Sequence, residues 1–258
     1  MGSRSKPRVS SDPKARRPGA GIARALSKLG RCSRTRAKAL VQEGRVRVDG
    51  IVCQDPEAPV DLERACIEVD ACSIEATAKI YLMLNKPRGL VTTASDEKGR
   101  RTVYDCLPNA DLSWLAPIGR LDKASEGLLL LTNDTRWAAR ILAPDAHIDK
   151  TYHVQVDCLA DASLAQRMIE GISTDQGDIL AAKEVRLLRQ GRRNCWLEVV
   201  LDEGKNRHIR RLLEGLGVNV LRLVRVAVGP LTLGRLAKGE CRRLTAEEVR
   251  VLAKGIGQ

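Results

Sequence analysis

The sequence predicts an α+β protein built from a small N-terminal domain and a larger C-terminal domain. Three observations support this prediction. The chain has 258 residues, which is long for one average domain but sufficient for two domains of unequal size. Residues 21–52 show the apolar spacing of two short helices followed by the alternation of a β-hairpin. Beyond residue 79, strand-like and helix-like segments follow one another along the chain.

The beginning of the chain is basic and rich in Ser, Pro, Gly and Arg. We expect residues 1–20 to form a disordered basic arm, because such a composition cannot bury enough apolar surface to fold. For the first few of these residues, a start-site remnant is the alternative interpretation. The N-terminus also lacks an apolar stretch, so no secretory signal peptide is expected.

Residues 21–78 are expected to form the small domain. Apolar residues recur at helical spacing from Ile22 onward, and Gly30 ends this first helix. Ser33 is a suitable N-cap for a second helix, which Gly44 ends.

A hairpin follows these two helices. Residues 45–48 alternate between polar and apolar side chains, and Asp49-Gly50 favours a tight turn that brings residues 51–52 back alongside them. Basic side chains are frequent in this segment, and those expected to contact RNA are Arg24, Arg34, Arg36 and Lys38.

Three of these four cations lie in the first turns of the second helix, where the helix dipole disfavours positive charge. Phosphates bound there, by both the side chains and the free N–H groups, would explain why three cations occur at these unfavourable positions. An ordinary solvated basic face is the alternative.

The net charge of +12, from 44 basic and 32 acidic side chains, favours a polyanionic partner, and nucleic acid is the first candidate. An anionic membrane surface is the second candidate partner, but no membrane-spanning apolar run or lipidation motif supports it.

The eight cysteines and three histidines show no metal-binding pattern. No Cys-x-x-Cys pair is present and the histidines are not at ligand spacing, so we expect no metal site. Scattered cysteines of this kind are typical of reduced thiols in a cytoplasmic protein.

The segment Gly119-Arg120-Leu121-Asp122 contains a candidate catalytic carboxylate. Asp122 lies in a glycine-bounded loop shortly before residues 128–131, a wholly apolar run typical of a strand buried on both faces. A carboxylate held at such a boundary is a candidate catalytic group. A structural pair between Arg120 and Asp122 is the alternative interpretation.

A second candidate segment is the strand predicted at residues 150–156. The period of two places Lys150 and Tyr152 on the same face of this strand. An ammonium group and an aromatic ring are therefore presented on the same side of the strand, and an aromatic ring can stack on a nucleic-acid base. An ordinary sheet residue is the alternative interpretation of Tyr152.

The third candidate segment follows the strand predicted at residues 195–201. Gly204 can end this strand, and a helix follows it. The buried stripe of this helix contains Ile209, Leu212, Leu213 and Leu216. Arg207 and Arg210 lie on a polar stripe of the same helix. A solvated basic helix face is the alternative.

The last part of the chain completes the larger domain. Strands are expected over residues 220–233, where Arg222 and Arg225 stand among apolar residues. Thr245 and Glu248 have the spacing of a capping box for a final helix.

These three segments, together with Leu84-Asn85-Lys86-Pro87-Arg88-Gly89, resemble the motifs of the RsuA-type pseudouridine synthases, which isomerise single uridines in ribosomal RNA. The helix–helix–hairpin segment resembles the S4 domain, a small RNA-binding module. The resemblance implies that Asp122 is the catalytic aspartate, that Arg210 pairs with it, and that Tyr152 stacks on the uracil. An adjacent arginine would keep the carboxylate ionised and oriented. Arg120, Lys150 and Arg207 would support the site or contact phosphate.

The resemblance also implies an architecture and a reaction. Residues 79–258 would form a catalytic domain with a mixed, mainly antiparallel sheet flanked by helices. The target uridine must leave the stack to react, and the isomerisation calls for no cofactor. The expected partner is ribosomal RNA or an assembling ribosomal subunit, with large-subunit RNA slightly favoured by Ser125-Glu126-Gly127 and Asn206-Arg207. We expect a cytoplasmic monomer without a membrane partner.

One departure and two alternatives accompany this interpretation. His208 stands where the family usually has Gln, and because both side chains donate a hydrogen bond we expect a modest effect. The first alternative is a non-catalytic ribosome-associated RNA binder that kept the fold. A cysteine hydrolase that uses His153 or His208 is a weaker alternative, since no local signature supports it.

Overall fold

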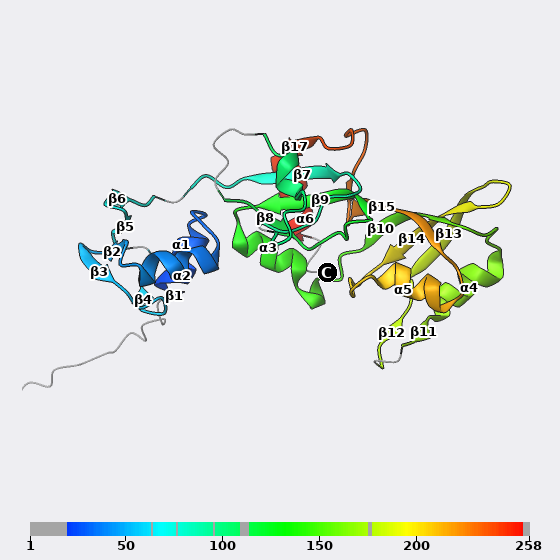
Figure 1. Ribbon diagram of the computed structural model, residues 1–258, viewed down its shortest axis with the longest axis horizontal. Coiled ribbons are helices and arrows are strands. Elements are labelled where there is room, and N and C mark those ends of the chain that lie inside the picture. The colour runs from blue at the N-terminus through cyan, green and yellow to red at the C-terminus, as the bar shows by residue number, and fades with distance from the viewer. Residues whose placement is uncertain are drawn as a thin grey trace, which may run out of the picture. The chain divides into compact units, whose positions relative to one another are not determined.

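The computed structural model describes residues 20–62, 64–75, 77–94, 96–108, 114–174 and 177–254 (Figure 1). The chain divides into two compact units, residues 1–76 and residues 77–258, and both combine helices with sheets, as predicted for an α+β protein. The predicted basic arm lies outside the described residues except for Ala20, which pairs with Val60 in a short strand.

The described residues of the first unit form two helices, a four-stranded antiparallel sheet and a two-stranded pair of β1 with β4. Ser33 caps the second helix, as predicted, by accepting a hydrogen bond from the amide of Arg36 at 3.1 Å. Asp49 and Gly50 have φ angles of 52° and 79°, which confirms the tight hairpin turn. The elements are β1 (Ala20–Gly21), α1 (Ile22–Lys28), α2 (Arg34–Gln42), β2 (Val46–Val48), β3 (Ile51–Cys53), β4 (Pro59–Val60), β5 (Ile67–Val69) and β6 (Cys72–Ser73), and the sheet order is β3-β2-β5-β6.

The second unit is organised around a mixed sheet with the path β13-β14-β10-β15-β9-β7-β17, to which β16 and β8 add at β15 and β9. Every pairing in it is antiparallel except that of β15 with β9, which confirms the predicted mixed, mainly antiparallel sheet. Its strands are β7 (Tyr81–Lys86), β8 (Ala116–Ile118), β9 (Glu126–Thr132), β10 (Lys150–Val156), β13 (Glu184–Gln190), β14 (Cys195–Leu201), β15 (Val220–Val228), β16 (Leu231–Thr232) and β17 (Cys241–Arg243).

Helices cover this sheet. They are α3 (Thr135–Leu142), α4 (Ala162–Glu170), α5 (His208–Gly215) and α6 (Ala246–Lys254), with the short 3-10 turns η1 (Val103–Cys106) and η2 (Pro144–Ala146) and a separate hairpin of β11 (Ile172–Ser173) and β12 (Ile179–Leu180). Thr245 and Glu248 form the predicted capping box, with amide-to-side-chain bonds of 2.8 and 3.1 Å. None of the helices in the described ranges combines the length and the apolar character needed to cross a membrane.

Two hydrophobic clusters meet at β9. One cluster contains Leu129 and Leu131 of β9 with residues of α4 and α5, and the other contains Leu128 and Leu130 with residues of α3 and α6. All seven residues of β9 are buried, which confirms the prediction of a strand covered on both faces.

The parallel contact between β9 and β15 begins directly after the loop that carries Asp122. Glu126 lies beside Val224 and Gly127 lies beside Arg225. Gly127 has a φ of 102°, and a Cβ atom built on it would lie 2.2 Å from the carbonyl oxygen of Arg225. Only glycine therefore allows β15 to approach β9 this closely, and this approach brings Arg225 next to the Asp122 loop.

Candidate active site

A cavity of about 450 Å³ opens in the second unit between the Asp122 loop, the start of α5, and strands β10 and β15. Five of the residues predicted for the site line it, namely Arg120, Asp122, Lys150, Tyr152 and Arg207. Segments far apart in the sequence therefore contribute to one cavity.

Backbone hydrogen bonds hold the Asp122 loop in place. The carbonyl oxygen of Asp122 accepts a hydrogen bond from the amide of Ser125 at 3.0 Å, which closes a turn. The carbonyl of Lys123 accepts from the amide of Gly89 at 2.7 Å. The loop is thereby fixed to the turn after β7, and the half-buried carboxylate of Asp122 faces the cavity.

A buried ammonium group supports the same loop. Lys86 is completely buried, and its Nζ donates to the carbonyl oxygens of Ser125 at 2.8 Å, Asp122 at 3.1 Å and Pro87 at 3.3 Å. Burial lowers the pKa of Lys86 to about 8, although the charges of Asp122 and Glu126 act in the opposite direction. The sequence prediction placed Lys86 only in a turn, and its position in the resembling motif was the one signal of a special role.

Lys86 makes stability depend on pH. Its pKa of about 8 in the folded chain lies below the ordinary value of 10.5, so between these pH values the unfolded chain binds more protons and the folded state gains stability as the pH rises. We expect Lys86→Met to lower the free energy of unfolding, because three carbonyl groups lose their donor, and to lower it more at pH 9.5 than at pH 7.5. Urea unfolding of both proteins at the two pH values measures this difference, and equal deficits at both would contradict it.

Arg210 does not form the expected salt bridge with Asp122, although both residues belong to the described part of the chain. Its guanidinium donates instead to the carbonyl oxygens of Ala124 at 3.2 Å and Val220 at 3.4 Å. Burial and the neighbouring Arg207 lower the pKa of Arg210, whereas the charge of Asp122 raises it, so the two groups are close enough to interact through their charges. Arg210 thus lies behind the Asp122 loop rather than in the cavity lining.

Tyr152 and Lys150 lie on the same face of β10, as the alternation predicted. Tyr152 is 9% exposed and Lys150 is half-buried, and both line the cavity. The Nζ of Lys150 donates to the carbonyl oxygen of Asp202 at 3.3 Å. Burial and then the charge of Arg225 lower the pKa of Lys150, so the two cations are near neighbours.

Arg225 is a lining residue that the sequence prediction did not assign to the site. It is 7% exposed, and its Nε donates to the carbonyl oxygen of Leu128 at 2.7 Å. The sequence shows Arg225 among the apolar residues of a predicted strand, but only the pairing of β15 with β10 places it beside Tyr152. His208 also lines the cavity, and burial lowers its pKa, which favours a neutral ring.

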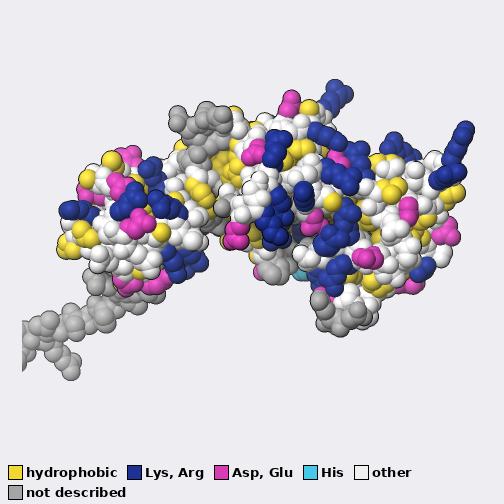
Figure 2. Space-filling model, in the orientation of Figure 1, with side chains coloured by type: hydrophobic (Ala, Val, Ile, Leu, Met, Phe, Trp, Pro, Cys, Tyr) yellow, Lys and Arg dark blue, Asp and Glu magenta, His cyan; other side chains and the backbone are white. Residues whose placement is uncertain are grey.

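The lining of the cavity is strongly basic. Its cations are Arg120, Lys150, Lys205, Arg207 and Arg225, whereas Asp122 is its one carboxylate among the described residues. Lys205 is paired with Glu203 at 2.9 Å. Figure 2 shows Lys and Arg side chains gathered over the surface between α3 and α5. This charge balance suits a polyanionic substrate.

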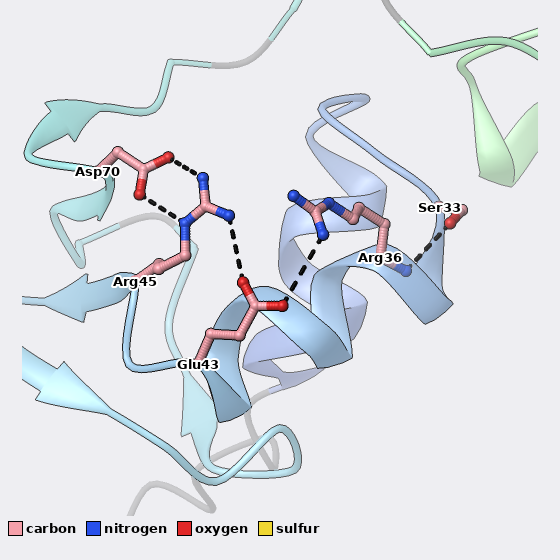
Figure 3. A network of polar contacts seen from close by, with 5 residues as sticks. All are labelled: Ser33, Arg36, Glu43, Arg45 and Asp70. Atoms are coloured by element: carbon pink, nitrogen blue, oxygen red, sulfur yellow. Dashed lines mark hydrogen bonds and ion pairs between the residues drawn. The ribbon is translucent and has the colours of Figure 1, made fainter.

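The first unit carries the four basic residues predicted to contact RNA, and all of them are exposed. Arg36 lies 3.9 Å from Glu43, and Lys38 lies 3.6 Å from Glu57. Figure 3 shows that Glu43 is shared with Arg45, which also binds Asp70 through two hydrogen bonds of 2.6 and 2.7 Å. Exposed pairs of this kind contribute little to stability, so the cations remain available for phosphates.

No group of three or more His, Cys, Asp or Glu side chains that could hold a metal ion occurs within the described residues.

Comparison with known proteins gives matches along most of the chain. Residues 80–215 match the RNA pseudouridylate synthase family, and residues 21–64 match the S4 domain. The chain is 35% identical over 232 residues to the ribosomal large subunit pseudouridine synthase B of Bacillus subtilis, a match that covers 90% of this chain and 94% of that protein. It is 36% identical over 233 residues to an uncharacterized RNA pseudouridine synthase of Aquifex aeolicus, with 90% and 93% covered. A crystal structure of a pseudouridylate synthase superposes with a TM-score of 0.64 at 25% identity and covers 91% of this chain and 100% of its own.

Proposed function

Because the chain belongs to the RNA pseudouridylate synthase family and carries an S4 domain, we propose that it converts a specific uridine of ribosomal RNA to pseudouridine. The observation that carries this proposal is that Asp122 and Tyr152 line the same basic cavity. The large-subunit enzyme of Bacillus subtilis among its relatives supports large-subunit RNA as the substrate, free or in an assembling subunit. We further propose that the protein acts as a monomer in the cytoplasm.

In the proposed reaction, the N1–C1′ bond of uridine breaks, the uracil rotates within the cavity, and a new bond forms between C5 and C1′. The proton on C5 is lost to solvent and N1 gains one, so the reaction is balanced without an oxidant, a reductant or a cofactor. A base inside a duplex cannot reach the cavity, so the target nucleotide is flipped out. Its uracil stacks on the ring of Tyr152, which the neighbouring strands hold in place.

Asp122 acts on the sugar, either by attacking C1′ or by removing a proton. Both routes need an ionised carboxylate at a fixed position, and the contacts of Lys86 and Arg210 with the loop carbonyls supply that position. Lys150, Arg120 and Arg207 are proposed to bind the phosphates on either side of the flipped nucleotide.

Release of tritium from ribosomal RNA transcripts labelled at C5 of uridine tests this proposal directly. We expect release that depends on the protein, and the loss of one pseudouridine from the large-subunit RNA of a strain that lacks it. An unchanged pseudouridine map in both ribosomal RNAs would instead favour a non-catalytic ribosome-associated binder that kept the fold.

We expect the first unit to contribute to RNA affinity and not to the isomerisation itself. We expect deletion of residues 1–78 to weaken RNA binding and to lower the slope of log K against log salt concentration by up to about 3, because four phosphate contacts are lost. Binding isotherms at several salt concentrations measure both effects. The full-length chain with glutamine at Arg24, Arg34, Arg36 and Lys38 is the matched control and should show the same change in slope. An unaltered slope in either protein would contradict the role of this unit.

A further inference from the structure

A second pocket lies on the other face of the catalytic sheet. Its volume is about 400 Å³, and we call its lining the Trp196 face, which consists of His153, Leu188, Arg189, Trp196, Arg222 and Val224. None of these residues lines the cavity that contains Asp122.

The alternation of the strands separates the two faces. Tyr152, Val154, Leu197 and Leu223 are buried in the cluster that packs against α4 and α5. The neighbouring residues in the sequence therefore point to the opposite side of β10, β14 and β15. On that side Trp196 is partly exposed and Leu188 is 44% exposed, so this part of the sheet is open.

The centre of the Trp196 face is an aromatic ring with two guanidinium groups close to it. The Cζ atom of Arg189 lies 4.9 Å from the ring centroid of Trp196, and that of Arg222 lies 5.7 Å from it. Arg222 is anchored because its Nε and Nη2 bind the buried carboxylate of Glu126 at 2.8 and 3.0 Å. The ring and the fixed guanidinium of Arg222 thus form a preorganised flat surface.

The charge around this surface is positive. Arg189 makes no ion pair with any described residue, and neither do the exposed Arg192 and Arg193 in the turn between β13 and β14. Glu198 follows Trp196 by two residues in the sequence. Its carboxylate lies 3.5 Å from the Nε2 of His153. A partner that supplies both flat apolar groups and negative charges fits this face, which is the combination found in single-stranded nucleic acid.

We propose that the Trp196 face is a second RNA-binding surface, where an unpaired base of single-stranded RNA stacks on Trp196 while Arg189, Arg192 and Arg193 bind the adjacent phosphates. This inference rests on the proposed function, because it takes RNA as the partner. The surface holds RNA that flanks the target and leaves the catalytic cavity free for the flipped nucleotide.

Binding of a fluorescein-labelled oligouridine by the full-length protein, followed by fluorescence anisotropy, tests the proposal. We expect Trp196→Leu to weaken binding about 5- to 100-fold without a change in salt dependence, because a stacking surface is lost and no charge is removed. Arg189→Gln should weaken binding and also lower the salt slope by about 0.7. Trp196→Phe should retain most of the affinity, and Arg250→Gln, which removes an exposed arginine paired with Glu247, should change nothing.

Two further measurements make the outcome decisive. Photo-cross-linking of an oligouridine that carries 5-iodouridine should yield a peptide that contains Trp196. The RNA concentration that gives half-maximal tritium release should rise for the Trp196→Leu and Arg189→Gln proteins and should stay unchanged for the Arg250→Gln protein. Unchanged affinity of both the Trp196→Leu and Arg189→Gln proteins would overturn the proposal and would leave a protein as the partner of this face. Failure of the wild-type protein to release tritium would instead count against the proposed function, whatever the binding data show.

Discussion

Asp122→Asn should reduce tritium release from uridine-labelled ribosomal RNA by at least about 10³-fold while RNA affinity stays within about two-fold of the wild type. The asparagine side chain has nearly the same shape, so the loop should remain fixed by Lys86, Ser125 and Gly89, which all bind backbone carbonyl oxygens of the loop and not the Asp122 side chain. The amide can neither attack the sugar nor accept a proton from it. Affinity should persist because the surrounding cations bind the phosphates.

The control for this substitution is Asp105→Asn. Asp105 is an exposed carboxylate of the same unit that pairs with Arg101 at 3.1 Å and does not line the cavity. Its replacement removes the same charge and should leave tritium release unchanged. Substantial turnover by the Asp122→Asn protein would refute the assignment of Asp122 as the catalytic group.

Gly127→Ala should lower the free energy of unfolding by more than about 2 kcal/mol and should also abolish most of the tritium release. Two costs combine at this position. An alanine would have to adopt a φ of 102°, and its Cβ would lie 2.2 Å from the carbonyl oxygen of Arg225. The contacted atom is backbone, so β15 must move away from β9. That movement displaces Arg225 and the loop that ends at Glu126.

Gly89→Ala separates these two costs. Gly89 has a φ of 99°, close to that of Gly127, but a Cβ at this position would have no heavy atom within 4 Å. This variant should therefore show only the conformational cost, about 1 kcal/mol. Urea unfolding of the three proteins provides the comparison. Equal destabilisation by both substitutions would show that the close approach of β15 to β9 is not what requires glycine.

Local sequence patterns predicted the parts of the site that depend on a single strand or helix. The period of two in residues 150–156 placed Lys150 and Tyr152 on one face, and both line the cavity. The apolar spacing in α5 predicted the buried Ile209, Leu212 and Leu213. These predictions succeeded because side-chain direction follows from the backbone period alone.

Features that depend on pairing between distant strands could not be predicted. The parallel contact of β9 with β15 and the resulting position of Arg225 are set by a close approach that no local pattern encodes. The salt bridge expected from the resemblance failed to appear for a similar reason, because the carbonyl oxygens of Ala124 and Val220 hold the guanidinium of Arg210.

Other elements were missed although the sequence carried a signal. Helix α4 has Asp161 as its N-cap, which accepts from the amide of Leu164 at 2.9 Å, and Leu164 and Met168 form its buried stripe. This pattern is typical of a short helix. Strand β13 is different, since most of its residues are exposed and its sequence lacks alternation, so only its pairing with β14 defines it.

The burial of β9 on both faces has a consequence for how activity fails under stress. Because its leucines belong alternately to the cluster under α3 and α6 and to the cluster under α4 and α5, neither half of the domain can open locally without disturbing this strand. The loop that carries Asp122 is attached directly to it. Turnover should therefore be lost together with cooperative, global unfolding, and the amide protons of β9 should be among the slowest in the domain to exchange with solvent.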